Sequence, residues 1–278
     1  MRLVTIRIGA QTRAGRLEGD RILELDHADA GALLAAVGVG GAADAEPVAE
    51  HPLHGADLAP VVPRPSKIFC LGLNYAAHIR ETGRDIPEFP TLFAKFPDAL
   101  VGARDPILLP PESARADWEV ELAIVIGRAA RRVSVEEAGA AIAGYTICND
   151  VTMRDWQQRT LQWLQGKTWE RSTPLGPALV TPDELDAGVD LALRCEVDGE
   201  VMQDGRTSDL VFGPAECVAY ISTIATLQPG DVISTGTPGG IGDARTPPIY
   251  LRPGQVVRTS IEGIGEMVNG CVADSGRR

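Results

Sequence analysis

The chain contains the stretch Trp118-Glu-Val-Glu-Leu-Ala-Ile-Val-Ile126, in which a polar–apolar alternation passes into an unbroken apolar run. This pattern predicts a buried β-strand. Side chains two residues apart point to the same face of a strand, so Glu119 and Glu121 are expected to lie side by side. Close, partly buried carboxylates repel each other unless a cation neutralises them, and oxygen ligands suit Mg²⁺, Mn²⁺ or Ca²⁺. The pair therefore indicates a divalent-metal site, with a solvated strand face as the alternative.

A further carboxylate follows the next apolar strand, which is predicted over Gly144–Asp150. Asp150 ends this strand, where a carboxylate can reach into a site. The alternative is that Asp150 caps the helix expected over Met153–Leu164, because aspartate is a favoured N-cap residue. On spacing alone, Asp150 is a candidate metal ligand with an equally ordinary structural explanation.

One histidine lies in a context that suits catalysis. A short helix is predicted over Tyr75–Thr82, in which His78 and Glu81 are three residues apart and share a face. A carboxylate in that position orients an imidazole for use as a general base. A surface pair is the alternative. The other three histidines are expected to be solvated: His27, His51 and His54.

A glycine-rich loop, Ser234-Thr-Gly-Thr-Pro-Gly-Gly-Ile-Gly242, follows a strand predicted over 231–235. It lacks the Gly-Lys-Ser/Thr ending of a phosphate-binding loop, and the prolines after it disfavour a following helix. Its backbone N–H groups and hydroxyls could instead hold a carboxylate. The alternative is a flexible turn between strands.

Strands outnumber helices along the chain, and no regular strand–helix–strand alternation is present, which predicts a strand-rich, mixed α+β fold rather than a Rossmann fold. Pro60, Pro63 and Pro65 suggest a boundary between a small N-terminal domain (1–62) and a larger domain (63–278). The first domain is too short for a robust core of its own, so we expect it to pack on the second.

The remaining elements follow from local signals. We expect strands within 1–25 and over 67–72, 255–261 and 265–272. A hairpin over 191–202 is expected to turn at Asp198-Gly199 in a type I′ turn. Helices are predicted over Ala30–Val37, with Asp29 as the N-cap and a loose segment after it, over 135–141, with Ser134 as the N-cap, and over 214–227.

The composition narrows the range of partners. The 278 residues include 26 basic and 38 acidic side chains, and the net charge of −12 argues against a nucleic-acid or anionic membrane partner. The five cysteines are scattered, and the sequence shows neither a signal peptide nor an apolar run of membrane-spanning length. We therefore expect a reduced, cytoplasmic protein. Lysine is scarce in this arginine-rich chain, so each lysine is a candidate for a specific role. The three are Lys67, Lys95 and Lys167.

Several spaced motifs resemble, in order, those of the fumarylacetoacetate hydrolase family, and they span residues 65–272. They are Gly72-Leu-Asn-Tyr-Ala-Ala-His-Ile-Arg-Glu81, Phe93-Ala-Lys-Phe-Pro-Asp-Ala-Leu-Val-Gly102, Asp117-Trp-Glu-Val-Glu-Leu-Ala123, Asn149-Asp-Val-Thr-Met-Arg-Asp155, Gly166-Lys167, Pro174-Leu-Gly-Pro177 and Thr235-Gly-Thr-Pro-Gly-Gly-Ile-Gly242. One departure lies after the lysine, where many members have an aromatic residue and Asp-Thr-Phe or Asp-Gly-Phe. Here the sequence is Thr168-Trp-Glu-Arg-Ser-Thr173.

The resemblance implies a mixed β-sandwich roll that forms a homodimer and holds one Mg²⁺ or Mn²⁺ per active site. The implied metal ligands are Glu119, Glu121 and Asp150. His78 and Glu81 match the family's catalytic dyad, and Lys167 matches a lysine that contacts substrate beside the metal. The other expected substrate contacts are Arg154, Gln157, Thr237, Tyr75 and Gly236, whereas Lys95 is expected to be structural.

The resemblance also implies that the small-molecule substrate is a 2-oxo acid. We first expect hydrolysis of a C–C bond in an acylpyruvate-type substrate, in which His78 activates water and a pyruvate enolate leaves. The alternatives are a decarboxylase or isomerase of oxaloacetate-like or 2-hydroxy-dienedioate substrates in aromatic catabolism, a ureidoglycolate-type lyase, and a catalytically silent binding protein. A phosphoesterase is disfavoured because the carboxylates supply ligands for only one metal.

Overall fold

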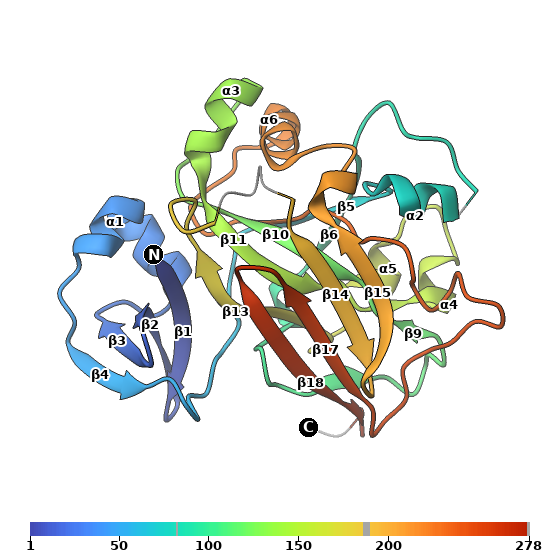
Figure 1. The fold of residues 1–278 in the computed structure, drawn as a ribbon, viewed down its shortest axis with the longest axis horizontal. Helices are drawn as coiled ribbons and strands as arrows, with labels where there is room; N and C mark the ends of the chain where they lie inside the picture. Colours follow the sequence, from blue (N-terminus) through green and yellow to red (C-terminus); the bar gives the residue numbers. More distant parts are fainter. Residues whose placement is uncertain (82, 186–189, 277–278) are drawn as a thin grey trace.

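The computed structural model of the chain describes residues 1–81, 83–185 and 190–276, and most of its strands form two sheets (Figure 1). The larger sheet runs in the order β4 (Ala49–Pro52), β3 (Arg21–Leu25), β2 (Gln11–Glu18), β1 (Arg2–Ile8), β13 (Thr173–Val180), β11 (Ile142–Asn149), β10 (Val120–Ile126), β16 (Val232–Ser234), β5 (Ile68–Gly72) and β6 (Thr91–Lys95), with β7 (Leu100–Val101) paired to β13. The smaller sheet runs in the order β15 (Glu200–Arg206), β14 (Ala192–Val197), β17 (Val256–Ile261), β18 (Gly265–Ala273) and β8 (Ile107–Leu109).

Strand β10 shows why the two sheets pack together and where the acidic residues lie. Val120 and Leu122 face the core cluster that includes residues of the smaller sheet. Ala123 faces the second core cluster, on the other side of the larger sheet. Glu119 and Glu121 continue the face of Ala123, because side chains alternate along a strand. The predicted strand-rich α+β sandwich is therefore confirmed, and the two carboxylates share one face as expected.

The helices are short. They are α1 (Ala30–Asp44), α2 (Ala76–Glu81), α3 (Val135–Ala138), α4 (Arg154–Gln157), α5 (Leu164–Lys167) and α6 (Pro214–Ile224), with 3₁₀ turns at Pro97–Ala99, Gly139–Ala141 and Thr207–Asp209 and a small pair of strands, β9 (Ala116–Asp117) and β12 (Thr152–Met153). Helix α2 confirms the helix predicted from residue 75, whose last residue, 82, lies outside the described residues.

The predicted helix cap at Ser134 and the predicted hairpin turn at Asp198-Gly199 can both be checked against the backbone geometry. Ser134 caps α3, because its hydroxyl accepts the Glu137 N–H at 3.3 Å. Asp198 and Gly199 have φ values of 51° and 83°, as a type I′ hairpin turn requires. Both predictions are confirmed.

The N-terminal strands lie at the left of Figure 1, in blue, and extend the larger sheet through the antiparallel pairing of β1 with β13. The expected packing of this segment on the rest of the chain is thus confirmed. Asp29 caps the following helix, as predicted. The helix predicted over Ala30–Val37 is confirmed, because non-helical backbone at Gly38, where φ is 67°, separates it from a second helical stretch within α1. The segment expected to be loose contains the end of α1 and strand β4.

The prediction of one long helix over Met153–Leu164 was wrong. Helix α4 is followed by a reversal, and α5 folds back against it. A Cβ on Gly166 would lie 2.6 Å from the backbone nitrogen of Gln157, so only glycine fits this approach. The segment predicted as one helix therefore contains two helical turns that face each other, and this reversal carries Lys167 into the interior.

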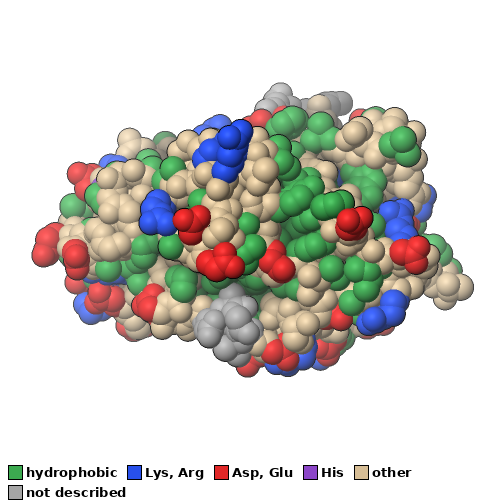
Figure 2. Space-filling model, turned by 90° about the horizontal axis from the view of Figure 1, so that it is seen from above, with side chains coloured by type: hydrophobic (Ala, Val, Ile, Leu, Met, Phe, Trp, Pro, Cys, Tyr) green, Lys and Arg blue, Asp and Glu red, His purple; other side chains and the backbone are tan. Residues whose placement is uncertain are grey.

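The surface fits the composition. Acidic and basic side chains are interspersed with apolar ones on the face drawn in Figure 2, and no broad basic patch covers that face. Across the described ranges, the longest apolar helices are too short to cross a membrane.

Candidate metal centre and active site

Three buried carboxylates meet at the ends of two paired strands. Glu119 precedes β10, Glu121 lies within it, and Asp150 follows β11. The backbone holds them in register, because the Asp150 N–H donates to the Glu119 carbonyl at 2.8 Å. One carboxylate oxygen from each residue lies within 4.8 Å of the others, and the three residues are 5%, 1% and 0% exposed. We call these three residues the carboxylate triad.

Two buried lysines neutralise part of the triad. The Lys167 ammonium donates to Glu119 Oε2 at 2.6 Å and to Asp150 Oδ2 at 2.7 Å. The Lys95 ammonium donates to Asp150 Oδ1 at 2.5 Å. Burial opposes the charge of Lys167, but Asp150 and Glu119 together raise its pKa. Lys95 was expected to be structural, and it contacts the triad directly. Two of the three lysines in the chain therefore bind triad carboxylates.

Glu121 is the triad member without a cationic partner among the described residues. Its Oε2 accepts the Ser234 hydroxyl at 2.5 Å and the Gly236 N–H at 2.9 Å. Burial, then repulsion by Asp150 and Glu119, raises its pKa well above the usual range. A set of three carboxylates with one charge left uncompensated fits a hard divalent cation such as Mg²⁺ or Mn²⁺.

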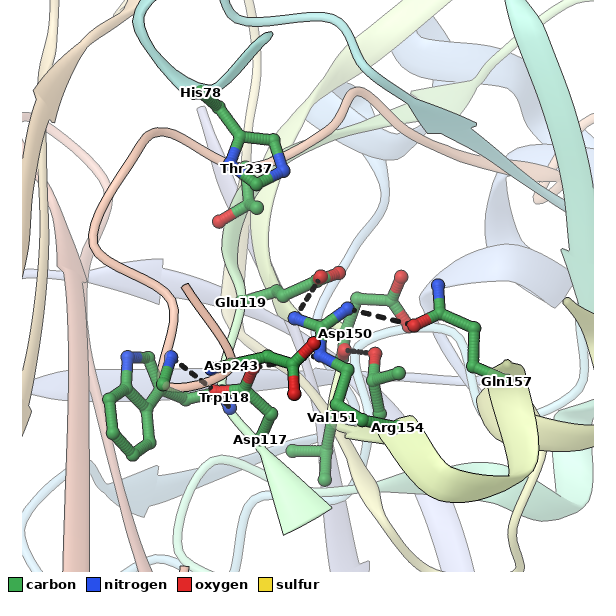
Figure 3. A network of polar contacts seen from close by, with 12 residues as sticks. His78, Asp117, Trp118, Glu119, Asp150, Val151, Arg154, Gln157, Thr237 and Asp243 are labelled. Atoms are coloured by element: carbon green, nitrogen blue, oxygen red, sulfur yellow. Dashed lines mark hydrogen bonds and ion pairs between the residues drawn. The ribbon is translucent and has the colours of Figure 1, made fainter. Parts of the chain in front are cut away.

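Arg154 links the triad to α4 (Figure 3). Its Nη2 donates to Glu119 Oε1 at 2.6 Å, and its Nη1 donates to Gln157 Oε1 at 3.1 Å. Burial raises the pKa of Glu119, but attraction to Lys167 and Arg154 outweighs it and lowers that pKa to about 2. Glu119 is therefore ionised and held from two sides.

Asp117 was not among the predicted site residues, yet it supports Arg154. This fully buried carboxylate accepts Arg154 Nε at 2.8 Å, the Gly242 N–H at 2.7 Å and the Asp243 N–H at 3.0 Å. Its position two residues before Glu119, on the same face of an extended segment, was the available signal. It fixes the guanidinium of Arg154 to the glycine-rich loop.

The predicted histidine–glutamate pair is present on α2. His78 Nδ1 lies 3.2 Å from Glu81 Oε2, and Glu81 in turn accepts the Gly240 N–H at 3.1 Å. The pKa of Glu81 is lowered, first by the hydrogen bond with His78. Burial opposes this effect, and the hydrogen bond from the Gly240 N–H adds to it. The dyad is thus anchored to the glycine-rich loop.

The glycine-rich loop does hold carboxylates, as its composition suggested, but they belong to the chain itself. The N–H groups of Gly236, Gly240 and Gly242 bind one carboxylate each: those of Glu121, Glu81 and Asp117. One loop therefore joins the triad, the dyad and the support of Arg154.

A cavity of about 680 Å³ opens over these groups. Its walls include most of the predicted site residues: His78, Glu119, Glu121, Arg154, Gln157, Lys167 and Thr237. The hydroxyl of Thr237 is already engaged, since it donates to the Val120 carbonyl at 2.9 Å and accepts Gln203 Nε2 at 2.8 Å.

Two expected substrate contacts do not line this cavity. Tyr75 is fully buried in the main core cluster, and burial raises the pKa of its hydroxyl. Gly236 uses its N–H to hold Glu121 instead. Their predicted contacts with substrate stay predictions, whereas the structure places both residues outside the cavity lining. Of the histidines expected to be solvated, His51 instead pairs with Glu24 at 2.7 Å and is half-buried.

The two-sheet fold thus places a cavity over a buried carboxylate triad. A family model described as fumarylacetoacetate (FAA) hydrolase C-terminal matches residues 67–272. The chain therefore belongs to the fumarylacetoacetate hydrolase family, as its motifs suggested.

Known relatives agree with this assignment. The chain is 47% identical over 214 residues to the mitochondrial oxaloacetate tautomerase FAHD2A of Bos taurus, which covers 76% of this chain and 68% of the relative. The structure of the present chain resembles that of fumarylacetoacetate hydrolase from Exiguobacterium antarcticum. The TM-score is 0.85, the sequence identity is 33%, and the match covers 99% of this chain and 100% of the other. The structure also resembles that of 5-carboxymethyl-2-hydroxymuconate delta-isomerase from Mycobacterium smegmatis, with a TM-score of 0.83, 35% identity and the same coverage.

Proposed function

We propose that this protein is a divalent-metal-dependent tautomerase that moves a proton between the keto and enol forms of a short 2-oxo acid, with oxaloacetate as the leading substrate. The observation that carries the proposal is His78, paired with Glu81, in the wall of the cavity that also exposes Glu119 and Glu121 of the triad. Its 47% identity to an oxaloacetate tautomerase supports proton transfer rather than bond cleavage as the main reaction.

The carboxylate triad would hold the metal, Mg²⁺ or Mn²⁺. When bound, such an ion supplies Lewis-acid charge to the oxygens of a 2-oxo acid. The chain adds its own positive charge at the same place, because Lys167 lies 2.6 Å from Glu119 and lines the cavity. Lys167 thus stabilises negative charge that develops on the substrate's C2 oxygen.

The dyad supplies the proton transfer. Glu81 binds His78 Nδ1 and fixes the ring, so Nε2 is the atom that takes a proton from carbon 3 of the keto acid. The electron pair of that C–H bond forms the C2–C3 double bond, and the C2 oxygen gains the charge. Protonation of that oxygen gives the enol, and the reverse sequence restores the keto acid.

Hydrolysis of a C–C bond, our first expectation from sequence, is the second candidate. The same dyad could activate a water molecule, and the 33% identical fumarylacetoacetate hydrolase structure supports this reaction. The two reactions share the stabilisation of an enolate and differ in whether His78 serves carbon or water.

The test follows the ultraviolet absorbance of enol-oxaloacetate with Mg²⁺, with Mn²⁺ and with EDTA. Acylpyruvate cleavage and the release of pyruvate from oxaloacetate are measured in parallel. The His78→Gln variant is expected to lose about 100-fold or more of the tautomerase rate, as general-base catalysis implies. The matched control is His51→Gln, because His51 also pairs with a glutamate, Glu24, but lies outside the cavity. Cleavage of an acylpyruvate faster than tautomerisation of oxaloacetate would reverse the order of the two candidates.

A further inference from the structure

Three lysine or arginine side chains line the cavity: Arg84, Arg154 and Lys167. Two of them are buried and already neutralised. Arg154 is bound to Asp117 and Glu119 at 2.8 and 2.6 Å, and Lys167 is bound to Glu119 and to the third triad member at 2.6 and 2.7 Å. Their charges therefore serve the metal end of the cavity.

Arg84 differs from the other two cations. Its side chain is exposed, and within the ranges that the structure describes its guanidinium forms no ion pair. Its backbone is fixed relative to the dyad, because its N–H donates to the carbonyl of Ile79 in α2 at 3.2 Å. A cation with no carboxylate partner thus stands in the cavity wall, on the segment that follows His78.

The remaining polar wall does not cancel this charge. Asp243 also lines the cavity, but its carboxylate is bound by Arg115 at 2.5 Å, by the Tyr250 hydroxyl at 2.6 Å and by Gln158 at 3.0 Å. Neutral amide side chains that suit a carboxylate also lie in this part of the wall, those of Gln157 and Gln162.

We infer that Arg84 selects dicarboxylic substrates by binding the carboxylate farthest from the reacting carbonyl. The inference rests on the proposed function, in which the 2-oxo end of the substrate occupies the triad end of the cavity. Guanidinium groups bind carboxylates with two parallel hydrogen bonds, which gives both affinity and orientation. A four-carbon 2-oxo diacid would therefore be preferred over a 2-oxo acid whose far end is neutral.

The experiment compares oxaloacetate with its 4-ethyl ester, which keeps the 2-oxo acid end and loses the far charge. Arg84→Gln is expected to lower kcat/KM for oxaloacetate about 10- to 100-fold, mainly through KM, since a charge-assisted hydrogen bond is lost. The ester should change less than about twofold, and Arg84→Lys should recover part of the loss. The matched control is Arg80→Gln, because Arg80 is also exposed on α2 but does not line the cavity.

The outcomes separate this inference from the proposed function. An equal loss on both substrates, or no loss on either, would overturn the role of Arg84 while leaving the tautomerase proposal in place. If the wild-type protein converts neither substrate, the proposed function fails and the specificity inference fails with it.

Discussion

Asp117 holds Arg154 in place through the Nε atom of its guanidinium. Asp117 Oδ2 accepts Arg154 Nε at 2.8 Å, and the same guanidinium reaches Glu119 through Nη2 at 2.6 Å. Because Asp117 also accepts the Gly242 N–H, it joins α4 to the glycine-rich loop. Arg154 therefore touches the cavity in a position that a buried carboxylate sets.

A double-mutant cycle tests this relationship. Asp117→Asn is expected to lower kcat/KM about tenfold or more, because Arg154 loses the charge-assisted bond that orients it. If Asp117 acts through Arg154, the Asp117→Asn/Arg154→Gln double variant should be no worse than Arg154→Gln alone, with a coupling energy of about 1.5–3 kcal/mol. The measurement is kcat/KM for all four proteins.

The control cycle pairs Asp117→Asn with Arg7→Gln. Arg7 binds Asp57 and Asp105 and shares no partner with Asp117, so these effects should add to within about 0.5 kcal/mol. Full additivity between Asp117 and Arg154 would show instead that Asp117 only stabilises the fold.

The triad predicts opposite stability effects for two similar substitutions in the metal-free protein. Glu121 is buried without a cation, so its ionisation costs free energy, and Glu121→Gln should raise the melting temperature by about 2–4 °C per kcal/mol gained. Glu119→Gln should destabilise by about 3–5 kcal/mol, because it leaves Lys167 and Arg154 buried without their shared partner. Both variants should lose metal binding, measured by calorimetry.

The stability gained by Glu121→Gln should depend on pH. A carboxyl whose folded pKa is raised destabilises the fold above its unfolded pKa, and the cost vanishes when the group is protonated in both states. The gain from Glu121→Gln should therefore disappear as the pH falls below about 4.3, the usual glutamate value. A loss of stability in Glu121→Gln at neutral pH in EDTA would contradict the view that its charge lacks a partner.

Local rules predicted the Glu119 and Glu121 pair, and the family resemblance added Asp150 to it. Glu119 and Glu121 share a face through strand periodicity, and β11 pairs with β10 so that its end brings Asp150 to the same point. The dyad followed in the same way from helical spacing between His78 and Glu81. These positions depend on contacts within an element or between neighbouring strands.

The support of the site was not predictable in this way. Lys95 and Asp150 are 55 residues apart, and Asp117 and Arg154 are 37 apart, so no local pattern signals either contact. The burial of Tyr75 was not predictable either. It lies beside the dyad in sequence, but its side chain faces the core, and sequence position alone does not show which side of a loop is buried.

The five cysteines lead to a further prediction. All are free and buried, and burial raises the pKa of every one, to about 12 for Cys217 and Cys271. Because the thiolate is the reactive form, the folded protein should release almost no thionitrobenzoate from Ellman's reagent at pH 8, whereas the denatured chain should titrate all five. Rapid reaction of one or more thiols in the folded protein, counted by mass spectrometry, would contradict their burial.

Gly240 of the glycine-rich loop and Gly254 outside it share a positive φ, which glycine adopts readily and alanine does not. Gly240 has a φ of 99°, and a Cβ there would lie 2.3 Å from the Met202 carbonyl, whereas Gly254 has a φ of 93° and open space around it. Alanine at either position should cost about 1–2 kcal/mol from the left-handed conformation. Only Gly240→Ala should also move the N–H that holds Glu81, so its kcat/KM should fall about tenfold or more while that of Gly254→Ala stays near wild type. Equal activity in the two variants, compared at matched folded fractions, would show that the loop does not position the dyad.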